Sequence, residues 1–257
     1  MSYKINILCL LLTGLLTISC SNESKSAGIK DNKESISHQL KEANTLLNQD
    51  NPNYSKAFEL FLKAANKGNV TAQYNVGVFY RDGMGVKHDI NESIKWFEKA
   101  AEQNDPDAMY DLGLIYEDGK GVSKDTTKAY SWYKAASDLG HPVAQNNLAN
   151  FYRYGKGTNK DINKALNLYK SAAAQNYSTA QYNLGVIYML GEDVAIDQKE
   201  AFQWFKKAAE NNDVSSQYNL GLMYKRGLGI PVDQEKANFW LKKASDNGHP
   251  HAQDELN

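Results

Sequence analysis

Residues 72–107 read AQYNVGVFYRDGMGVKHDINESIKWFEKAAEQNDPD, and this pattern returns every 36 residues as far as the end of the chain. Small residues open each copy at that spacing: Ala72, Ala108, Ala144, Ala180, Ser216 and Ala252. Another column holds only tyrosine: Tyr80, Tyr116, Tyr152, Tyr188 and Tyr224. A fixed period of this length is typical of arrays in which each pair of elements buries its apolar face against the next pair.

The apolar positions within one copy predict two antiparallel helices, helix A over residues 71–81 and helix B over residues 89–103. Val76 and Tyr80 lie four apart and belong to one apolar stripe of helix A. Trp96 is expected to be buried on helix B. An aspartate column is expected to cap helix B in each copy: Asp89, Asp125, Asp161, Asp197 and Asp233.

Small residues in the middle of helix A form a further column: Gly77, Gly113, Ala149, Gly185 and Gly221. Because glycine disfavours a helix by about 1 kcal/mol relative to alanine, we expect helix B to approach closely there. Gly83 and Gly85 are expected to end helix A in the left-handed conformation. Asp193 takes the place of the second glycine in the fourth copy and is expected to adopt that conformation too, because aspartate tolerates it better than most residues. Prolines are expected at the first position of a helix A: Pro106, Pro142 and Pro250.

These residues resemble the Sel-one-like repeat family, which is related to the tetratricopeptide repeats. The first copy meets the family pattern at Ala72, Val76, Gly77, Tyr80, Gly83, Gly85, Val86, Asp89, Ser93, Trp96, Ala100 and Ala101. The resemblance covers residues 53–257 and implies an all-α fold, a right-handed α-solenoid of antiparallel helix pairs. Its expected divisions are a degenerate N-terminal capping repeat (35–71), five repeats (72–107, 108–143, 144–179, 180–215 and 216–251) and a partial C-terminal capping helix (252–257).

The N-terminus has the pattern of an exported lipoprotein. Lys4 precedes an almost wholly apolar run, so residues 1–19 are interpreted as a signal peptide. Residues 16–20, LTISC, resemble a bacterial lipobox, which implies lipidation of Cys20; alternatively, Cys20 is an ordinary thiol after a conventional signal peptide. Residues 20–34 are polar and are expected to form a flexible tether. Ser21 after the cysteine favours, by resemblance, an outer-membrane protein that faces the periplasm or the cell surface.

Composition and motifs exclude several classes of function. The 29 basic and 30 acidic side chains give a net charge of -1 without a basic stripe, so no nucleic acid is expected as a partner. No cofactor is predicted. His249 and His251 with Asp254 fall short of the four converging ligands of a structural zinc site, so no metal is expected. Ser131 begins a Ser-x-x-Lys sequence, but no Ser-Asp-Asn or Lys-Thr-Gly follows it.

Two columns of helix A are candidates for binding a partner, because they vary where their neighbours stay fixed or are rich in tyrosine and arginine. One column is Tyr74, Tyr110, Asn146, Tyr182 and Tyr218, and the other is Arg81, Glu117, Arg153, Met189 and Lys225. By resemblance to tetratricopeptide repeats these positions face a concave groove, which predicts a membrane-anchored, non-enzymatic adaptor for a peptide or protein. The alternatives are that the tyrosines pack between repeats, that the chain is a β-lactam-hydrolysing or peptidoglycan-acting enzyme, or that it is a passive envelope spacer. The oligomeric state stays open.

Overall fold

The computed structural model describes residues 20–256, so the predicted signal peptide lies outside the described residues. Within this range the chain forms twelve α-helices and a final 3₁₀ helix, and it contains no strand. The bounds are α1 Cys20–Leu47, α2 Tyr54–Asn66, α3 Val70–Asp82, α4 Ile90–Ala101, α5 Pro106–Asp118, α6 Thr126–Asp138, α7 Pro142–Tyr154, α8 Ile162–Ala174, α9 Ser178–Leu190, α10 Gln198–Glu210, α11 Val214–Arg226, α12 Gln234–Asp246 and η1 Asp254–Leu256.

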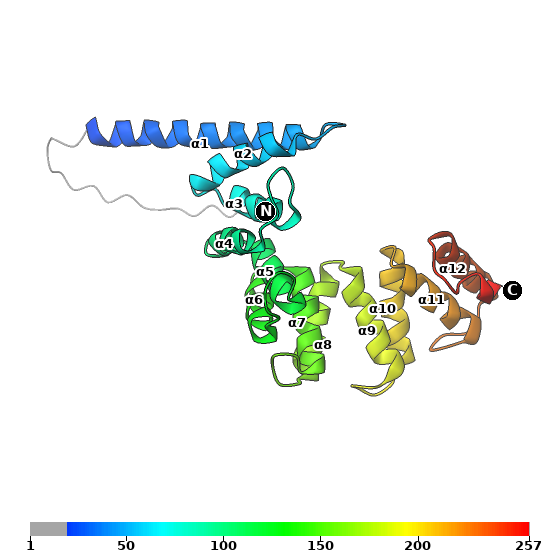
Figure 1. Cartoon of the computed structure of the whole chain (residues 1–257). Helices are drawn as coiled ribbons and strands as arrows, with labels where there is room; N and C mark the ends of the chain where they lie inside the picture. The colour runs from blue at the N-terminus through cyan, green and yellow to red at the C-terminus, as the bar shows by residue number, and fades with distance from the viewer. Residues whose placement is uncertain (1–19, 257) are drawn as a thin grey trace, which may run out of the picture.

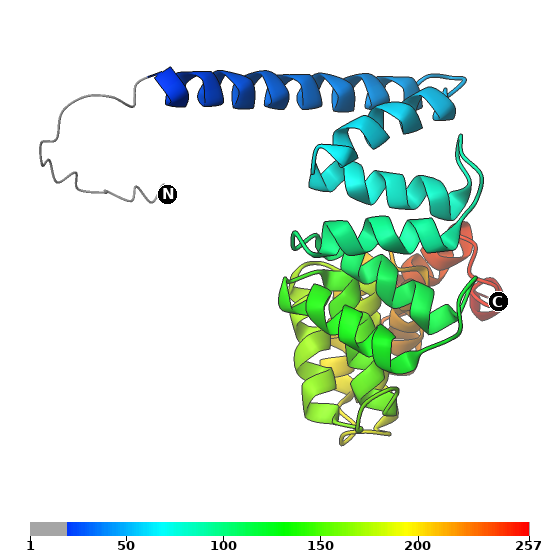
Figure 2. The same ribbon diagram turned by 60° about the vertical axis from the view of Figure 1, so that its left-hand side comes forward.

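The helices pack against one another in sequence order, which confirms the predicted α-solenoid. We call α3, α5, α7, α9 and α11 the A helices, and α4, α6, α8, α10 and α12 the B helices. The A–B pairs wind in an arc from the N-terminal end to α12, and α1 projects from that end beyond the pairs (Figures 1 and 2). Each pair corresponds to one copy of the sequence period.

Glycine and aspartate set the helix ends as the sequence predicts. The A helices end on glycines with a positive φ: Gly83 at 67°, Gly119 at 70°, Gly155 at 68°, Gly191 at 68° and Gly227 at 71°. At the start of α4, the Oδ1 atom of Asp89 accepts hydrogen bonds from the backbone N–H groups of Asn91 (3.0 Å) and Glu92 (3.1 Å). Pro106 and Pro142 begin α5 and α7, where the missing N–H needs no partner.

The column of small residues brings the two helices of each pair together. A Cβ atom added to Gly77 would lie 2.6 Å from the ring of Phe97, and one added to Gly113 would lie 2.6 Å from the ring of Tyr133. The same approach recurs at Gly185 with Phe205 (2.7 Å) and at Gly221 with Leu241 (2.7 Å). The expected close approach of helix B is therefore confirmed.

Both ends of the array differ from the sequence prediction. Residues 20–34 belong to helix α1 rather than to a flexible tether, because Gly28 is the only glycine and no proline interrupts residues 20–47. The later part of α1 packs on α2 through Ala43 and its neighbours. At the other end Pro250 lies in a turn, and the 3₁₀ helix η1 stands where a capping α-helix was expected. Ala252 is still fully buried against the last pair.

Candidate functional site

A groove opens between the end of α3, the start of α4 and the length of α5. It has a volume of about 530 Å³, and we call it the first groove. Its lining residues are Arg81, Asp82, His88, Ile90, Asp111, Leu114, Ile115, Asp118, Lys120 and Gly121. The groove thus combines an aliphatic floor, made by Ile90, Leu114 and Ile115, with charged groups from two consecutive repeats.

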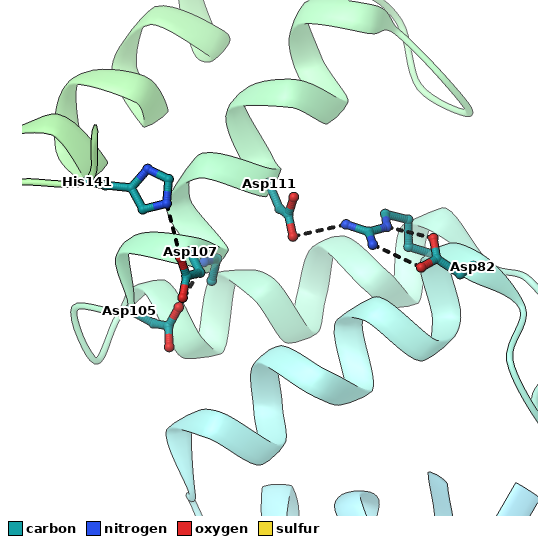
Figure 3. Close-up of polar contacts among 7 residues, drawn as sticks. Asp82, Asp105, Asp107, Asp111 and His141 are labelled. Atoms are coloured by element: carbon teal, nitrogen blue, oxygen red, sulfur yellow. Dashed lines mark hydrogen bonds and ion pairs between the residues drawn. The ribbon is translucent and has the colours of Figure 1, made fainter. Parts of the chain in front are cut away.

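Arg81 joins the two repeats at this groove. Its Nε and Nη2 atoms donate to the carboxylate of Asp82 at 2.7 and 2.9 Å, and its Nη1 atom donates to Oδ2 of Asp111 at 3.0 Å (Figure 3). Burial raises the pKa of Asp111, whose side chain is only 8% exposed, and the positive charge of Arg81 opposes this shift. The guanidinium is therefore fixed between two carboxylates.

His141 connects α5 to the following repeat. Its Nδ1 atom accepts the N–H of Ala144 (3.1 Å) and caps α7, so the proton of the neutral ring lies on Nε2, which donates to Oδ1 of Asp107 (3.0 Å). The ring also stacks on Tyr110, with ring centroids 5.0 Å apart. Figure 3 shows Asp107 directed toward His141 and Asp111 further along the same helix.

A second groove repeats the first one 36 residues further along the chain. It has a volume of about 240 Å³ and is lined by Glu117, Asn147, Asn150, Phe151, Tyr154 and Lys156. Each of these residues lies 36 positions after a lining residue of the first groove. Glu117, in the position of Arg81, accepts a hydrogen bond from the hydroxyl of Tyr133 (2.7 Å). The two grooves thus share one place in the fold and differ in chemistry.

Arg153, the next member of the Arg81 column, is buried in an ion pair rather than exposed to a partner. Its side chain is 6% exposed, and its Nε atom donates to Oδ2 of Asp193 at 2.6 Å. Lys160 reaches the other oxygen of Asp193 at 2.9 Å. Burial acts to raise the pKa of Asp193, but the hydrogen bonds from Lys160 and Arg153 outweigh it and lower the pKa.

The expectation that Asp193 would take the left-handed conformation of the glycines in its column is wrong. In the described part of the chain the residues other than glycine with a positive φ are Asn104, Asn176 and Asn212. Asp193 does not follow the glycines because its carboxylate is held in place by Arg153 and Lys160. The loop between α9 and α10 therefore differs from its counterparts in other repeats.

Four members of the tyrosine column pack against an aromatic ring of their own repeat. The ring centroids lie 5.6 Å apart for Tyr74 and Phe97, 6.0 Å for Tyr110 and Tyr133, 5.9 Å for Tyr182 and Phe205, and 4.1 Å for Tyr218 and His249. These tyrosines are half-buried, and Asn146 is only 3% exposed. Burial, with a smaller contribution from Asp111, raises the pKa of Tyr74.

The remaining predicted positions lie nearer the C-terminal end. Met189 is half-buried and packs against the apolar cluster of α10 and α11. The Nζ atom of Lys225 donates to the backbone oxygen (2.7 Å) and to Oε2 (2.9 Å) of Glu255, so it holds the C-terminal segment on the last repeat. Neither residue lines the first or the second groove.

Sequence reasoning missed a polar column that lies on the grooves. Its members are Asn75, Asp111, Asn147, Asn183 and Asn219. Asp111 lines the first groove and Asn147 lines the second. The 36-residue spacing would have revealed the column, because four of the five members are the same polar residue on an A helix.

The serine and lysine of the Ser-x-x-Lys sequence each contact another residue of α6. The Ser131 hydroxyl donates to the backbone oxygen of Thr127 (3.0 Å) on an exposed helix face, and Lys134 is paired with Asp138 (2.6 Å). Among residues 20–256 no group of histidine, cysteine or acidic side chains is arranged to hold a metal ion. In the same range no helix is both long enough and apolar enough to cross a membrane.

Comparisons with known proteins agree with this architecture. The family model described as Sel1 repeat matches residues 49–69, 70–105, 106–141, 142–177, 178–213 and 214–249. The crystal structure of a Sel1 repeat protein from Oxalobacter formigenes is 37% identical, covers 82% of this chain and 88% of its own, and superposes with a TM-score of 0.75. Two immunity proteins from Pseudomonas aeruginosa, 22% and 19% identical, share the fold with TM-scores of 0.53 and 0.54. They cover 82% and 87% of this chain and 81% and 83% of their own. A search among curated proteins finds no match.

Proposed function

The chain belongs to the Sel1 repeat family, and from this premise we propose that it is an adaptor of the bacterial cell envelope that holds a peptide or protein segment in the grooves of its A helices. Sel1 repeat proteins are generally scaffolds for protein–protein interaction rather than enzymes. Solenoids of this kind present extended surfaces to which a partner can bind over several repeats.

The observation that carries this proposal is the repetition of one groove with altered lining residues. The residues that cap the helices and fill the core recur in each copy, because the fold requires them. Between the first and second grooves, Arg81 gives way to Glu117 and Leu114 gives way to Asn150, although the two grooves lie at the same positions of the repeat. Glu117 and Asn150 each accept a hydrogen bond from a buried tyrosine of helix B, Tyr133 and Tyr169. Both residues also line the open groove, so a bound partner would meet a different set of side chains at each groove.

Anchoring through lipid on Cys20 is the second part of the proposal. Cys20 begins α1, and the N-terminal end of that helix points away from the helix pairs (Figure 2). Two or three acyl chains at this place would hold the chain stably at a membrane, since a single chain gives only marginal binding. The proposed location of the chain is the outer membrane, with the solenoid facing the periplasm or the cell surface.

Photocrosslinking in the native envelope tests the binding part of the proposal. A photoreactive residue at position 114 or 150 should give a defined crosslinked partner, whereas one at position 131, on the exposed face of α6, should not. No partner from either groove, or equal crosslinking from position 131, would favour a passive spacer and contradict the proposal.

The anchor is tested separately. Cys20→Ser should move the chain from the membrane fraction to the soluble fraction and abolish incorporation of a labelled fatty acid. Retention of Cys20→Ser in the membrane fraction would contradict lipid anchoring and leave groove binding untouched.

A further inference from the structure

We propose that the first groove recognises a peptide segment in which a lysine or arginine stands beside an aliphatic side chain. This inference rests on the proposed function and deepens it, because it names the chemistry of the partner at one groove. Three features of the groove support this inference: its aliphatic floor, its excess of carboxylates over cations, and the hydrogen bonds that Arg81 already donates to two of those carboxylates.

The floor provides a place for an aliphatic side chain. Ile90 begins α4, while Leu114 and Ile115 lie on α5, so the floor joins two consecutive repeats. A volume of about 530 Å³ lies within the range of pockets that hold a ligand, roughly 300 to 1,000 Å³. A leucine, isoleucine or valine of the partner would lose contact with water there, and this is favourable.

The charges favour a cation beside that side chain. The groove is lined by the carboxylates of Asp82, Asp111 and Asp118 and by the cations of Arg81 and Lys120, so the carboxylates exceed the cations by one. Asp107 lies one turn before Asp111 on the same helix and adds a further negative charge nearby. Its partner His141 balances that charge only when the imidazole is protonated.

Arg81 is poorly placed to receive an anionic partner. Three of its nitrogen atoms already donate to Asp82 and Asp111. A carboxylate of the partner would have to displace one of these groups, whose side chains would then lose their cation. A lysine or arginine of the partner would instead balance the one carboxylate in excess, and carboxylate oxygens can accept several hydrogen bonds.

Comparison with the second groove makes Asp111 the residue that would distinguish the two. It is the only carboxylate in a column whose other four members are asparagine, and Asn147 stands in its place in the second groove. Leu114 is likewise replaced by Asn150, so the aliphatic floor is lost there. These replacements also show that the fold accepts asparagine at both positions.

The test is selection of peptides from a random displayed library on the chain from residue 20 onward, carrying Cys20→Ser to keep it soluble. The peptides enriched by this protein should carry lysine or arginine next to leucine, isoleucine or valine. Asp111→Asn should weaken an enriched peptide at least about tenfold, the effect of losing a hydrogen bond to a charged group. Asp246→Asn, the same charge change at an exposed place on α12, should leave binding within about twofold.

A floor variant completes the design, because Leu114→Asn installs the residue that the second groove already carries. It should reduce selection of the aliphatic residue while the preference for a cation persists. Enrichment of acidic peptides, or equal binding by Asp111→Asn, would overturn the inference. If enriched peptides crosslink from position 150 and not from position 114, the inference fails and the proposed function stands. If no peptide is enriched and neither groove crosslinks a partner in the envelope, both fail.

Discussion

The ion pair between Arg153 and Asp193 gives a sharp prediction about stability. Asp193→Asn keeps the shape of the side chain but removes the charge that balances a guanidinium with 6% exposure. Loss of one partner of a buried ion pair destabilises a protein by about 3 to 5 kcal/mol. Two neighbours reduce that figure here: Glu192, whose Oε2 atom lies 3.7 Å from Nη2 of Arg153, can supply part of the missing charge, and Lys160 is largely solvated.

We therefore expect Asp193→Asn to lower the free energy of unfolding by about 2 to 3 kcal/mol. In a chain of this size such a loss corresponds to a fall in Tm of roughly 5 to 10 °C. Urea unfolding measures the change, and hydrogen exchange should locate it in α7 and in the loop between α9 and α10. Asp246→Asn, at an exposed carboxylate on α12, is the matched control and should change stability by less than about 0.5 kcal/mol.

The double variant Arg153→Met with Asp193→Asn tests whether the unpaired charge of Arg153 causes the loss of stability in Asp193→Asn. Methionine already occupies the same column at Met189, so the fold can accept it. Because the double variant buries no unpaired cation, it should be more stable than Asp193→Asn alone by at least about 1 kcal/mol. The reasoning is refuted if the two substitutions simply add, or if Asp193→Asn costs less than about 1 kcal/mol.

The pair also predicts how stability depends on pH. The pKa of Asp193 is lower in the folded chain than its ordinary value, so its contribution is complete above about pH 4 and is lost as the pH falls through the folded pKa. The difference in unfolding free energy between the wild-type chain and Asp193→Asn should therefore shrink below pH 4. A difference that stays constant down to pH 2 would contradict the ion pair as its source.

Two further predictions concern loops and caps. Gly157→Ala should destabilise the chain more than Gly140→Ala by about 1 to 3 kcal/mol in urea unfolding, although both glycines have a positive φ. A Cβ atom at position 157 would lie 2.5 Å from the backbone oxygen of Thr126, whereas one at position 140 would meet open space. Equal losses of stability would show that the positive φ alone causes them. His141→Ala should cost about 1 kcal/mol by removing the acceptor for the N–H of Ala144, and His141→Asn should recover most of this loss, while a failure of asparagine to do so would assign the loss to other contacts of the imidazole.

The features that sequence alone predicts are those determined within one repeat. Gly83 ends a helix and Asp89 begins the next through backbone geometry and hydrogen bonds that span only a few residues. The same glycine and aspartate recur at a spacing of 36 residues in five copies, so the helix boundaries can be assigned without ambiguity. The tether over residues 20–34 was wrong because it stands outside the period, and its polar composition suits an exposed helix as well as a coil.

The side-chain contacts at the grooves join different helices or consecutive repeats. The residues at a single position of the repeat therefore do not predict those contacts. Arg81, Glu117 and Arg153 share one column, yet the structure places them in a two-carboxylate cluster, a hydrogen bond with a tyrosine and a buried ion pair. What differs is the residue opposite, which comes from another helix or from the next repeat. Reading each column separately predicted one role for all three.

Two positions of the repeat that lie 30 residues apart are joined by a side-chain hydrogen bond in four of the repeats. The buried Gln73 accepts a hydrogen bond from Gln103 (2.7 Å), 30 residues later, and the pair recurs at Gln145 with Gln175, Gln181 with Asn211 and Gln217 with Asn247. The second repeat has Met109 and Leu139 at these two positions. Because a lone buried amide would lose a hydrogen-bond partner, the two positions change together. Spacings of 30 residues within the array therefore report contacts between helices that a single column at a spacing of 36 cannot reveal.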